Sequence, residues 1–349
     1  MKLHGIIVLL LISVFSTNPI WAAQFSGMYV FGDSLSDQGN IFAATSSNSN
    51  GPTPPLEYTD GINFGRFTNG LNYIDYLSED LGLSSRPYLK GGTNFSFGGA
   101  RISSHPYGGY SLLQQLDLFA GASGGMADPN ALYVVWAGAN DLADYLRSSG
   151  TALSPADSLT YLLSVIQDLA GFGAKNILVP NLPDIGLTPM IMALGSEATE
   201  MASALTTGFN ENLEAGLSSL ESTYADVNFI WFDSFGAFNE IFADPAASGF
   251  SNATEACYSE FVMPDGTVIG DPDKYLSWDG FHPTSAVHQI LADQMAGAVV
   301  PVPSTILLLV SGLVSLAGIY RRKKPSVKSI PVFKGRSISV SAFIISITD

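Results

Sequence analysis

Residues 28–40 read Met28-Tyr29-Val30-Phe31-Gly32-Asp33-Ser34-Leu35-Ser36-Asp37-Gln38-Gly39-Asn40. The apolar and aromatic residues 28–31 are typical of a short buried strand. Gly32 permits a tight turn, so a serine just after it can lie exposed at the end of the strand. The stretch therefore predicts a strand followed by a nucleophile candidate, Ser34, although it does not match the Gly-x-Ser-x-Gly nucleophile elbow, and Gly-Asp-Ser taken alone is more often a turn.

Four more segments have the same strand-like composition: residues 93–97, 132–136, 176–180 and 228–232. Helical patterns separate these segments. Ser154-Pro155, for example, is a good helix start, and an apolar stripe with helical spacing follows it in the sequence. Strands that alternate with helices predict a parallel sheet covered on both faces. We expect one α/β catalytic domain over residues 25–298, with its site at the carboxyl ends of the strands, where ligands gather in such sheets.

The composition excludes several classes of protein. Of the 349 residues, 46% are hydrophobic and 13% are charged, which supports a sizeable core and argues against disorder. The formal net charge of −16 repels phosphate backbones, so we expect no nucleic-acid partner. The single cysteine, Cys257, cannot form an internal disulfide. No group of His, Cys, Asp and Glu has metal-ligand spacing and no Walker-type loop occurs, so we expect no metal and no cofactor.

A second motif, near the end of the predicted domain, reads Asp279-Gly280-Phe281-His282-Pro283. A serine hydroxyl needs a base to take its proton, and histidine suits that role because its ordinary pKa lies near neutrality. A carboxylate beside the ring fixes its tautomer and stabilises the imidazolium. One short loop thus supplies both groups, and Pro283 is expected to start the helix that follows. The alternative is that His282 is a plain helix-entry residue.

Other residues of the same types are weaker candidates. Ser36 is a rival nucleophile in the same stretch. His105 is expected in a loop and His288 on the surface of a helix. Asp184 and Asp233 each follow a strand-like segment, and we interpret both mainly as turn residues.

Donors for a developing oxyanion are also present after predicted strands. Acyl transfer places negative charge on the former carbonyl oxygen, and fixed donors must meet it. Gly98-Gly99 follow the segment 93–97, and a glycine there lets a backbone N–H approach a substrate closely. Asn140 follows the segment 132–136 and offers a side-chain amide. Taken singly, each of these sites is better interpreted as a loop turn.

The order Ser, Gly, Asn and Asp-x-x-His resembles the four blocks of the GDSL (SGNH) hydrolases, over nearly the whole region 28–290. The Ser-Asp-x-Gly-Asn extension of the first block is similar to the lipase and phospholipase-type branch. The resemblance implies a flavodoxin-like three-layer α/β/α sandwich with a mostly parallel five-stranded sheet. It also implies a role for each matched residue: Ser34 as nucleophile, Ser34 N–H, Gly99 and Asn140 as oxyanion donors, Asp279 as orienter and His282 as base. The spacing of the second block selects Gly99 over Gly98.

The resemblance implies a serine esterase or lipase that cleaves carboxylic acyl esters through an acyl-Ser34 intermediate. The expected substrates are esters of lipids or small esters. Two alternatives stay open. One is an extracellular polysaccharide O-acetylesterase, and the other is a non-catalytic surface or matrix protein that retains the fold.

The two ends of the chain are interpreted as targeting segments. Residues 1–23 combine Lys2 with an apolar stretch and the small residues Ala22 and Ala23, which predicts a secretory signal peptide. A permanent anchor is the alternative. An exported protein is therefore expected.

The segment 299–324 has three parts: a proline-containing motif, an apolar run over 306–320 and the basic cluster 321–324. The basic cluster is expected to stay cytoplasmic. The pattern resembles PEP-CTERM sorting signals, which implies a transmembrane helix and an exosortase-type sorting machinery as partner. The same resemblance implies an exported protein of a Gram-negative bacterium, at the cell surface, associated with the outer membrane or extracellular. Val302 stands where such signals usually have Glu, and the tail 325–349 has no counterpart in them. An ordinary C-terminal membrane anchor is the alternative.

Overall fold

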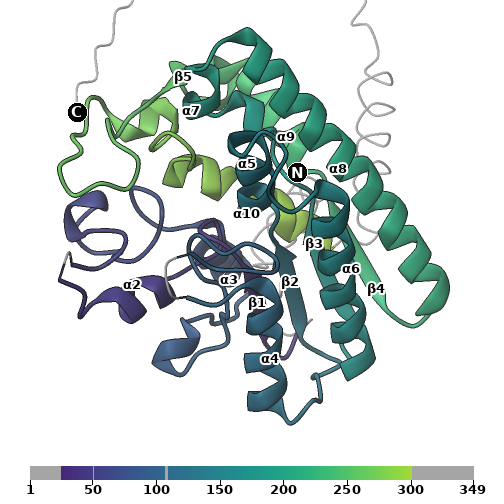
Figure 1. Cartoon of the computed structure of the whole chain (residues 1–349). Helices are drawn as coiled ribbons and strands as arrows, with labels where there is room; N and C mark the ends of the chain where they lie inside the picture. The colour runs from purple at the N-terminus through teal and green to yellow at the C-terminus, as the bar shows by residue number, and fades with distance from the viewer. Residues whose placement is uncertain (1–24, 50, 107–108, 301–349) are drawn as a thin grey trace, which may run out of the picture. The chain divides into compact units, whose positions relative to one another are not determined.

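The computed structural model describes residues 25–49, 51–106 and 109–300. Its main sheet has the strands β1 (Met28–Gly32), β2 (Leu132–Trp136), β3 (Asn176–Pro180) and β4 (Asn228–Phe232), which lie side by side in this order (Figure 1). All three pairings are parallel, and Gly32 aligns with Trp136 as Pro180 does with Phe232. The carboxyl ends of the strands therefore meet at one edge of the sheet.

The fifth predicted strand, residues 93–97, is reduced to an isolated parallel bridge between Val30 and Asn94. The segment still runs along the free side of β1, because Phe95 N donates to Val30 O at 2.7 Å. Asn94 is also bonded to the chain on its other side, where its N–H donates to Arg86 O and its carbonyl accepts from Tyr88 N. This divided pairing explains why the expectation of five strands is wrong by one for the described residues.

Nine α-helices alternate with the strands in the described part of the chain: α2 (Asn40–Thr45), α3 (Tyr73–Asp80), α4 (Leu112–Ser123), α5 (Ala139–Arg147), α6 (Pro155–Phe172), α7 (Pro189–Met192), α8 (Ser196–Thr223), α9 (Ser234–Ala243) and α10 (Ser285–Val299). The predicted start of α6 is confirmed, because Ser154 Oγ accepts from Asp157 N at 3.1 Å and Pro155 is the first helical residue. Helix α10 begins at Ser285, two residues later than Pro283 predicts.

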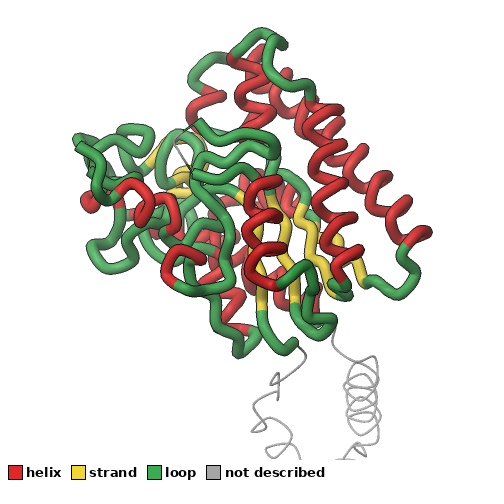
Figure 2. Tube along the Cα trace, turned by 60° about the horizontal axis from the view of Figure 1, so that its bottom comes forward, coloured by secondary structure: helices red, strands yellow, loops and turns green. Residues whose placement is uncertain are grey.

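Helices cover both faces of the sheet, as the alternating pattern predicts. Every residue of β2 is buried, which requires cover on both sides of that strand. Helix α3 contacts α10, whereas α4, α6 and α8 contact one another in sequence. Figure 2 shows the strands running side by side with helices packed around them. The structure is therefore an α/β fold with a parallel sheet, as expected.

A second, two-stranded parallel sheet positions the loop that holds Asp279 and His282. It pairs β5 (Asn252–Ala256) with β6 (Tyr275–Ser277), and β6 leads directly into that loop. Trp278 N donates to His282 O at 2.8 Å, so the loop folds back on its own start. The loop thus lies between a strand and the first turn of α10.

Within the described ranges, no helix combines the length and the apolar character that a bilayer crossing needs. The predicted signal peptide, the apolar run 306–320, the basic cluster and the tail 325–349 all lie outside these ranges.

Candidate active site

The turn that carries Ser34 is built by the end of β1. A Cβ at position 32 would collide with the Trp136 carbonyl oxygen on the neighbouring strand, so only glycine fits there. The chain then makes one helical turn, in which Ser36 N and Asp37 N donate to Asp33 O at 3.1 and 3.0 Å. This turn holds Ser34 at the carboxyl edge of the sheet, where its side chain lines a pocket.

The structure brings Ser34, His282 and Asp279 together from opposite ends of the domain. His282 Nε2 lies 2.8 Å from Ser34 Oγ. On the other side of the ring, Nδ1 lies 2.9 Å from Asp279 Oδ2 and 3.1 Å from Oδ1. Ser34 keeps 5% of its surface exposed and His282 keeps 3%, whereas Asp279 is fully buried. This geometry lets Nε2 accept the serine proton while Nδ1–H donates to the carboxylate.

Asp279 is held as a carboxylate by donors on every side. The backbone N–H groups of Phe281 and His282 both donate to Oδ1 at 2.7 Å. The phenol of Tyr58 donates to Oδ2 at 2.6 Å. Burial by itself would raise the pKa of Asp279, but the charge of His282 and these hydrogen bonds lower it below its ordinary value. Asp279 therefore stays ionised at any pH at which His282 is neutral.

Two aromatic rings from other loops lie against His282. The Phe67 ring lies 5.2 Å from the imidazole, and the Phe261 ring stacks on it at 5.6 Å with an angle of 8° between the planes. Sequence reasoning missed Tyr58, Phe67 and Phe261, because nothing in their local sequence distinguishes them from ordinary core aromatics.

The alternative serine and histidine candidates do not take part in the Ser34–His282–Asp279 set. Ser36 Oγ lies 2.7 Å from the Tyr73 phenol oxygen, away from His282. His105 binds Gly98 O through Nε2 at 2.9 Å, and burial lowers its pKa. The expectation that His288 lies on a helix surface is wrong. It is buried where α10 packs on α3, and burial lowers its pKa to about 3.

The backbone N–H groups expected to stabilise an oxyanion differ in their hydrogen bonding. Gly98 N–H donates to Asp37 Oδ2 at 2.8 Å and is therefore occupied. Among the described residues, Gly99 N–H and Ser34 N–H have no hydrogen-bond acceptor. Gly99 has a φ of +80°, a left-handed conformation that favours glycine. The Gly98 N–H is therefore paired and the Gly99 N–H is not, and the choice of Gly99 as the oxyanion donor stays a prediction.

Asn140 lies in the first turn of α5, directly after β2. Its Nδ2 donates to Ala100 O at 3.0 Å and lies 3.5 Å from Asp33 Oδ2, so the side chain ties α5 to the Gly99 turn and to the Ser34 turn. Arg101 strengthens the same connection, because it binds Gly99 O at 2.6 Å and forms an ion pair with Asp144 of α5 at 2.7 Å.

Asp33, the residue before Ser34, has a raised pKa of about 6. Burial raises this pKa, whereas the hydrogen bond from Leu35 N–H and the charge of His282 lower it by a smaller amount.

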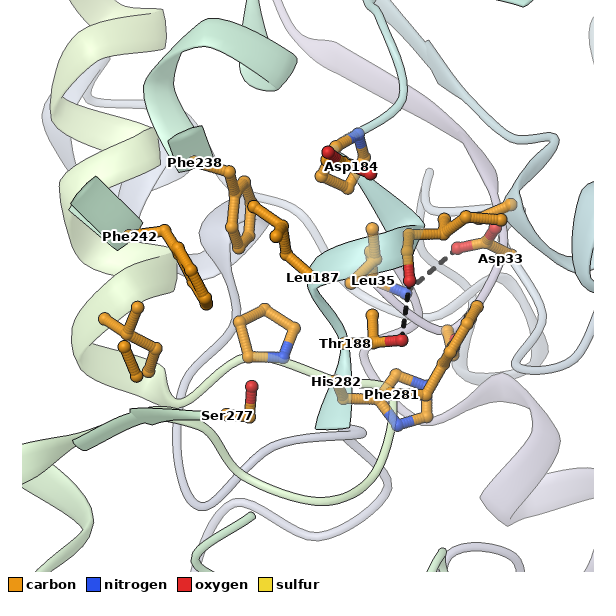
Figure 3. A pocket seen from close by; sticks show the side chains of 17 residues that line it. Asp33, Leu35, Asp184, Leu187, Thr188, Phe238, Phe242, Ser277, Phe281 and His282 are labelled. Carbon is orange, nitrogen blue, oxygen red and sulfur yellow. Dashed lines mark hydrogen bonds between the residues drawn. The ribbon is translucent and has the colours of Figure 1, made fainter. Parts of the chain in front are cut away.

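A pocket opens beside Ser34 and His282 and extends away from them between α9 and the two-stranded sheet. Figure 3 shows Phe238, Phe242 and Leu187 at the side away from Asp33 and His282. Asp184 also lines the pocket, and its carboxylate accepts from Gly186 N at 2.9 Å, as a turn residue does. The pocket therefore has a polar end with the Ser–His pair and an apolar end.

Over the described ranges, no group of three or more His, Cys, Asp or Glu side chains is arranged to hold a metal ion. Cys257 is fully buried, and burial raises the pKa of its thiol. Cys257 does not line the pocket.

The GDSL-like lipase/acylhydrolase family model matches residues 28–295. Two GDSL esterase/lipase proteins of Arabidopsis thaliana are each 28% identical to the chain, over 84% and 78% of it and over 91% and 86% of their own lengths. A crystal structure of a lipolytic G-D-S-L family member from Veillonella parvula is 12% identical, with a TM-score of 0.44 over 79% of this chain and 99% of that chain. Because the family model spans most of the sequence and hydrogen bonds link Ser34, His282 and Asp279 in one set, the chain belongs to the GDSL-like lipase/acylhydrolase family and is a carboxylic ester hydrolase.

Proposed function

We propose that the enzyme hydrolyses carboxylic acyl esters through a covalent acyl-Ser34 intermediate, with His282 as general base and acid and Asp279 as its orienting carboxylate. The observation that carries this proposal is the 2.8 Å contact between Ser34 Oγ and His282 Nε2, with Asp279 on the other ring nitrogen. A weak nucleophile beside an oriented base is the arrangement that covalent acyl transfer needs.

The reaction has two balanced steps. His282 takes the Ser34 proton as Oγ bonds to the ester carbonyl carbon, and the alcohol then leaves with the proton from His282 as its C–O bond breaks. Water next gives a proton to His282 and attacks the acyl carbon, and the acid leaves as Ser34 Oγ recovers that proton. The tetrahedral oxyanion in each step accepts hydrogen bonds from Ser34 N–H, from Gly99 N–H and from the Asn140 amide hydrogen that is not bonded to Ala100 O.

Covalent labelling tests this function directly. The full chain is assayed on p-nitrophenyl esters from acetate to palmitate, before and after reaction with a serine-directed organophosphonate. We expect loss of activity together with one phosphonyl group on the peptide that contains Ser34, located by mass spectrometry. Full activity after labelling of Ser34, or a label on another serine that tracks the inactivation, would overturn the assignment.

Asn140→Ala is expected to lower kcat by roughly 100- to 1,000-fold with little change in KM, since it removes one fixed oxyanion donor. The measurement is steady-state hydrolysis of p-nitrophenyl butyrate. Asn212→Ala on α8, where the side chain bonds Gly208 O, is the matched control and should keep the wild-type rate. Equal rates for wild type and Asn140→Ala would show that the amide does not meet the oxyanion.

We propose that the apolar end of the pocket binds the acyl chain. Phe238 and Phe242 are four residues apart on α9, so both point to the same face of the helix, and both line the pocket. An acetyl group would leave this end unfilled, whereas a chain of several carbons would reach it. This arrangement favours an acyl esterase of short to medium chain length over a polysaccharide O-acetylesterase.

Phe242→Ala is expected to shift the acyl preference to longer chains. Removing the ring enlarges the apolar end, and the ratio of kcat/KM for decanoate over butyrate esters should rise about 10-fold, the scale of discrimination by a few methylene-sized contacts. Phe235→Ala lies on the same helix but lines a different cleft, so it should leave the ratio unchanged. A wild-type enzyme restricted to acetate esters would instead support the O-acetylesterase function.

We also propose that the enzyme is exported from a Gram-negative cell and sorted at its surface. The support is the sequence pattern of residues 1–23 and of residues 299–324, including the apolar run and the basic cluster. Mass spectrometry of the mature protein from such a host should find a new N-terminus near residue 24 and cleavage near residue 301. A mature chain that keeps both ends and stays in the cytoplasmic fraction would exclude this route.

A further inference from the structure

The Tyr58 hydroxyl contacts the buried Asp279 carboxylate across 221 residues of sequence. Tyr58 closes a short 3-10 helix, η1 (Leu56–Tyr58), and its side chain is fully buried. Asp279 Oδ2 accepts from this hydroxyl at 2.6 Å and from His282 Nδ1 at 2.9 Å. The two donors share one oxygen, so each affects how the other is held. The proposed mechanism does not use this tyrosine.

Tyr58 acts as a neutral donor throughout the working pH range. Burial and the neighbouring Asp279 charge raise the pKa of its phenol well above the ordinary value. The ring itself is fixed by aromatic neighbours, with Tyr258 at 5.2 Å and Trp278 at 5.8 Å, both in edge-to-face geometry. The hydroxyl therefore has little freedom to leave the carboxylate.

The segment 58–71 that begins with Tyr58 also holds the rest of the loop that carries Asp279 and His282. Thr68 Oγ1 donates to Pro283 O at 2.9 Å, and Asn69 Oδ1 accepts from Ser285 N at 2.8 Å. The Phe67 ring of the same segment packs against His282. The segment 58–71 thus contacts the loop that carries Asp279 and His282 at several points and holds it in place.

We propose that Tyr58 is a positioning residue that sets both the orientation and the charge of Asp279, and through it the basicity of His282. This inference rests on the proposed function. The hydrogen bond spreads the negative charge of Asp279 onto the phenol, so less of that charge is available to stabilise the imidazolium. It also keeps Oδ2 in the plane that His282 Nδ1–H requires.

Tyr58→Phe tests the proposal in the full chain. Without the hydroxyl, kcat/KM at the pH optimum is expected to fall about 10-fold, the low end for a hydrogen bond to a charged group. The acid limb of the pH profile of kcat/KM reports protonation of the base in the free enzyme. It should move to higher pH by about half a unit, because Asp279 then bears more negative charge and stabilises the protonated base more strongly. Asp33 and His288 also act electrostatically with His282, and both are unchanged in this variant.

Tyr258→Phe is the matched control. Tyr258 belongs to the same buried aromatic cluster, but its hydroxyl donates to Met263 O and not to Asp279. Its removal should leave the acid limb at its wild-type position. A shift of equal size in both variants, or a folded Tyr58→Phe with the wild-type rate and profile, would overturn the proposal.

A second variant keeps the test decisive if Tyr58→Phe unfolds. Single-site replacement of Tyr58 by 3-fluorotyrosine retains the ring and makes the phenol a stronger donor, so the acid limb should move down. A fluorinated enzyme with an unmoved limb would count against the proposal. The proposed function is tested separately, by wild-type ester hydrolysis that is lost when the organophosphonate labels Ser34. If that test succeeds, a negative result with the Tyr58 variants contradicts only the role of Tyr58.

Discussion

Ser34→Ala is expected to remove nearly all ester hydrolysis, lowering kcat by about 10⁴-fold or more. The variant lacks the oxygen that forms the acyl intermediate, whereas the pocket and the oxyanion donors stay in place. A small residual rate is expected, because those donors still stabilise attack by water. The measurement is hydrolysis of p-nitrophenyl butyrate, with circular dichroism to show that the variant is folded.

Ser36→Ala is the matched control for this experiment. Ser36 is two residues away and is also buried, but its hydroxyl pairs with Tyr73 rather than His282. It should keep a rate within a few fold of wild type, with some loss of stability from the unpaired phenol. If Ser36→Ala were dead and Ser34→Ala active, the assignment of the nucleophile would have to be reversed.

Asp279→Asn is expected to lower kcat by about 10⁴-fold while the fold is kept. An amide of the same shape cannot hold His282 with its proton on Nδ1, so Nε2 no longer accepts from Ser34. The loss should be largest in kcat and small in KM, since Asp279 is fully buried and does not line the pocket.

Asp184→Asn supplies the comparison. Asp184 lines the same pocket, yet the contact of its carboxylate is with Gly186 N and not with a catalytic candidate. It should alter kcat by only a few fold. A rate for Asp279→Asn near that of Asp184→Asn would mean that His282 needs no oriented carboxylate, and the proposed mechanism would fail.

Much of the fold follows from local sequence. The strand-like segments 28–31, 132–136, 176–180 and 228–232 are strands, because short runs of buried residues between helical patterns have few other ways to satisfy their backbone groups. The segment 93–97 departs from the prediction, because Asn94 divides its backbone hydrogen bonds between β1 and residues 86–88. Pairing with two partners cannot be read from a segment alone.

Burial on helices was harder to predict than the helices themselves. Met201, Phe209 and Leu213 recur at multiples of four residues on α8, yet the Met201 side chain is 55% exposed while Phe209 and Leu213 are buried. Met201 lies in the first two turns, where Ala202 takes the buried position. His288 shows the opposite error, since a polar residue was expected outside and lies inside. Which face of a helix is covered depends on the neighbouring helix, which the periodicity does not specify.

The sequence by itself determined which residue types follow the predicted strands, and therefore the candidates Ser34, Gly99 and Asn140, because side chains after parallel strands converge on one edge. Asp279 and His282 were found from their motif, which supplies a base and a carboxylate three residues apart. Only the tertiary structure decided which N–H of Gly98-Gly99 is unpaired, since that depends on where Asp37 lies. It alone brought Tyr58 to Asp279 and two aromatic rings to His282. The Tyr58–Asp279 contact joins residues 221 positions apart in the sequence, and no local pattern in the chain encodes such a contact.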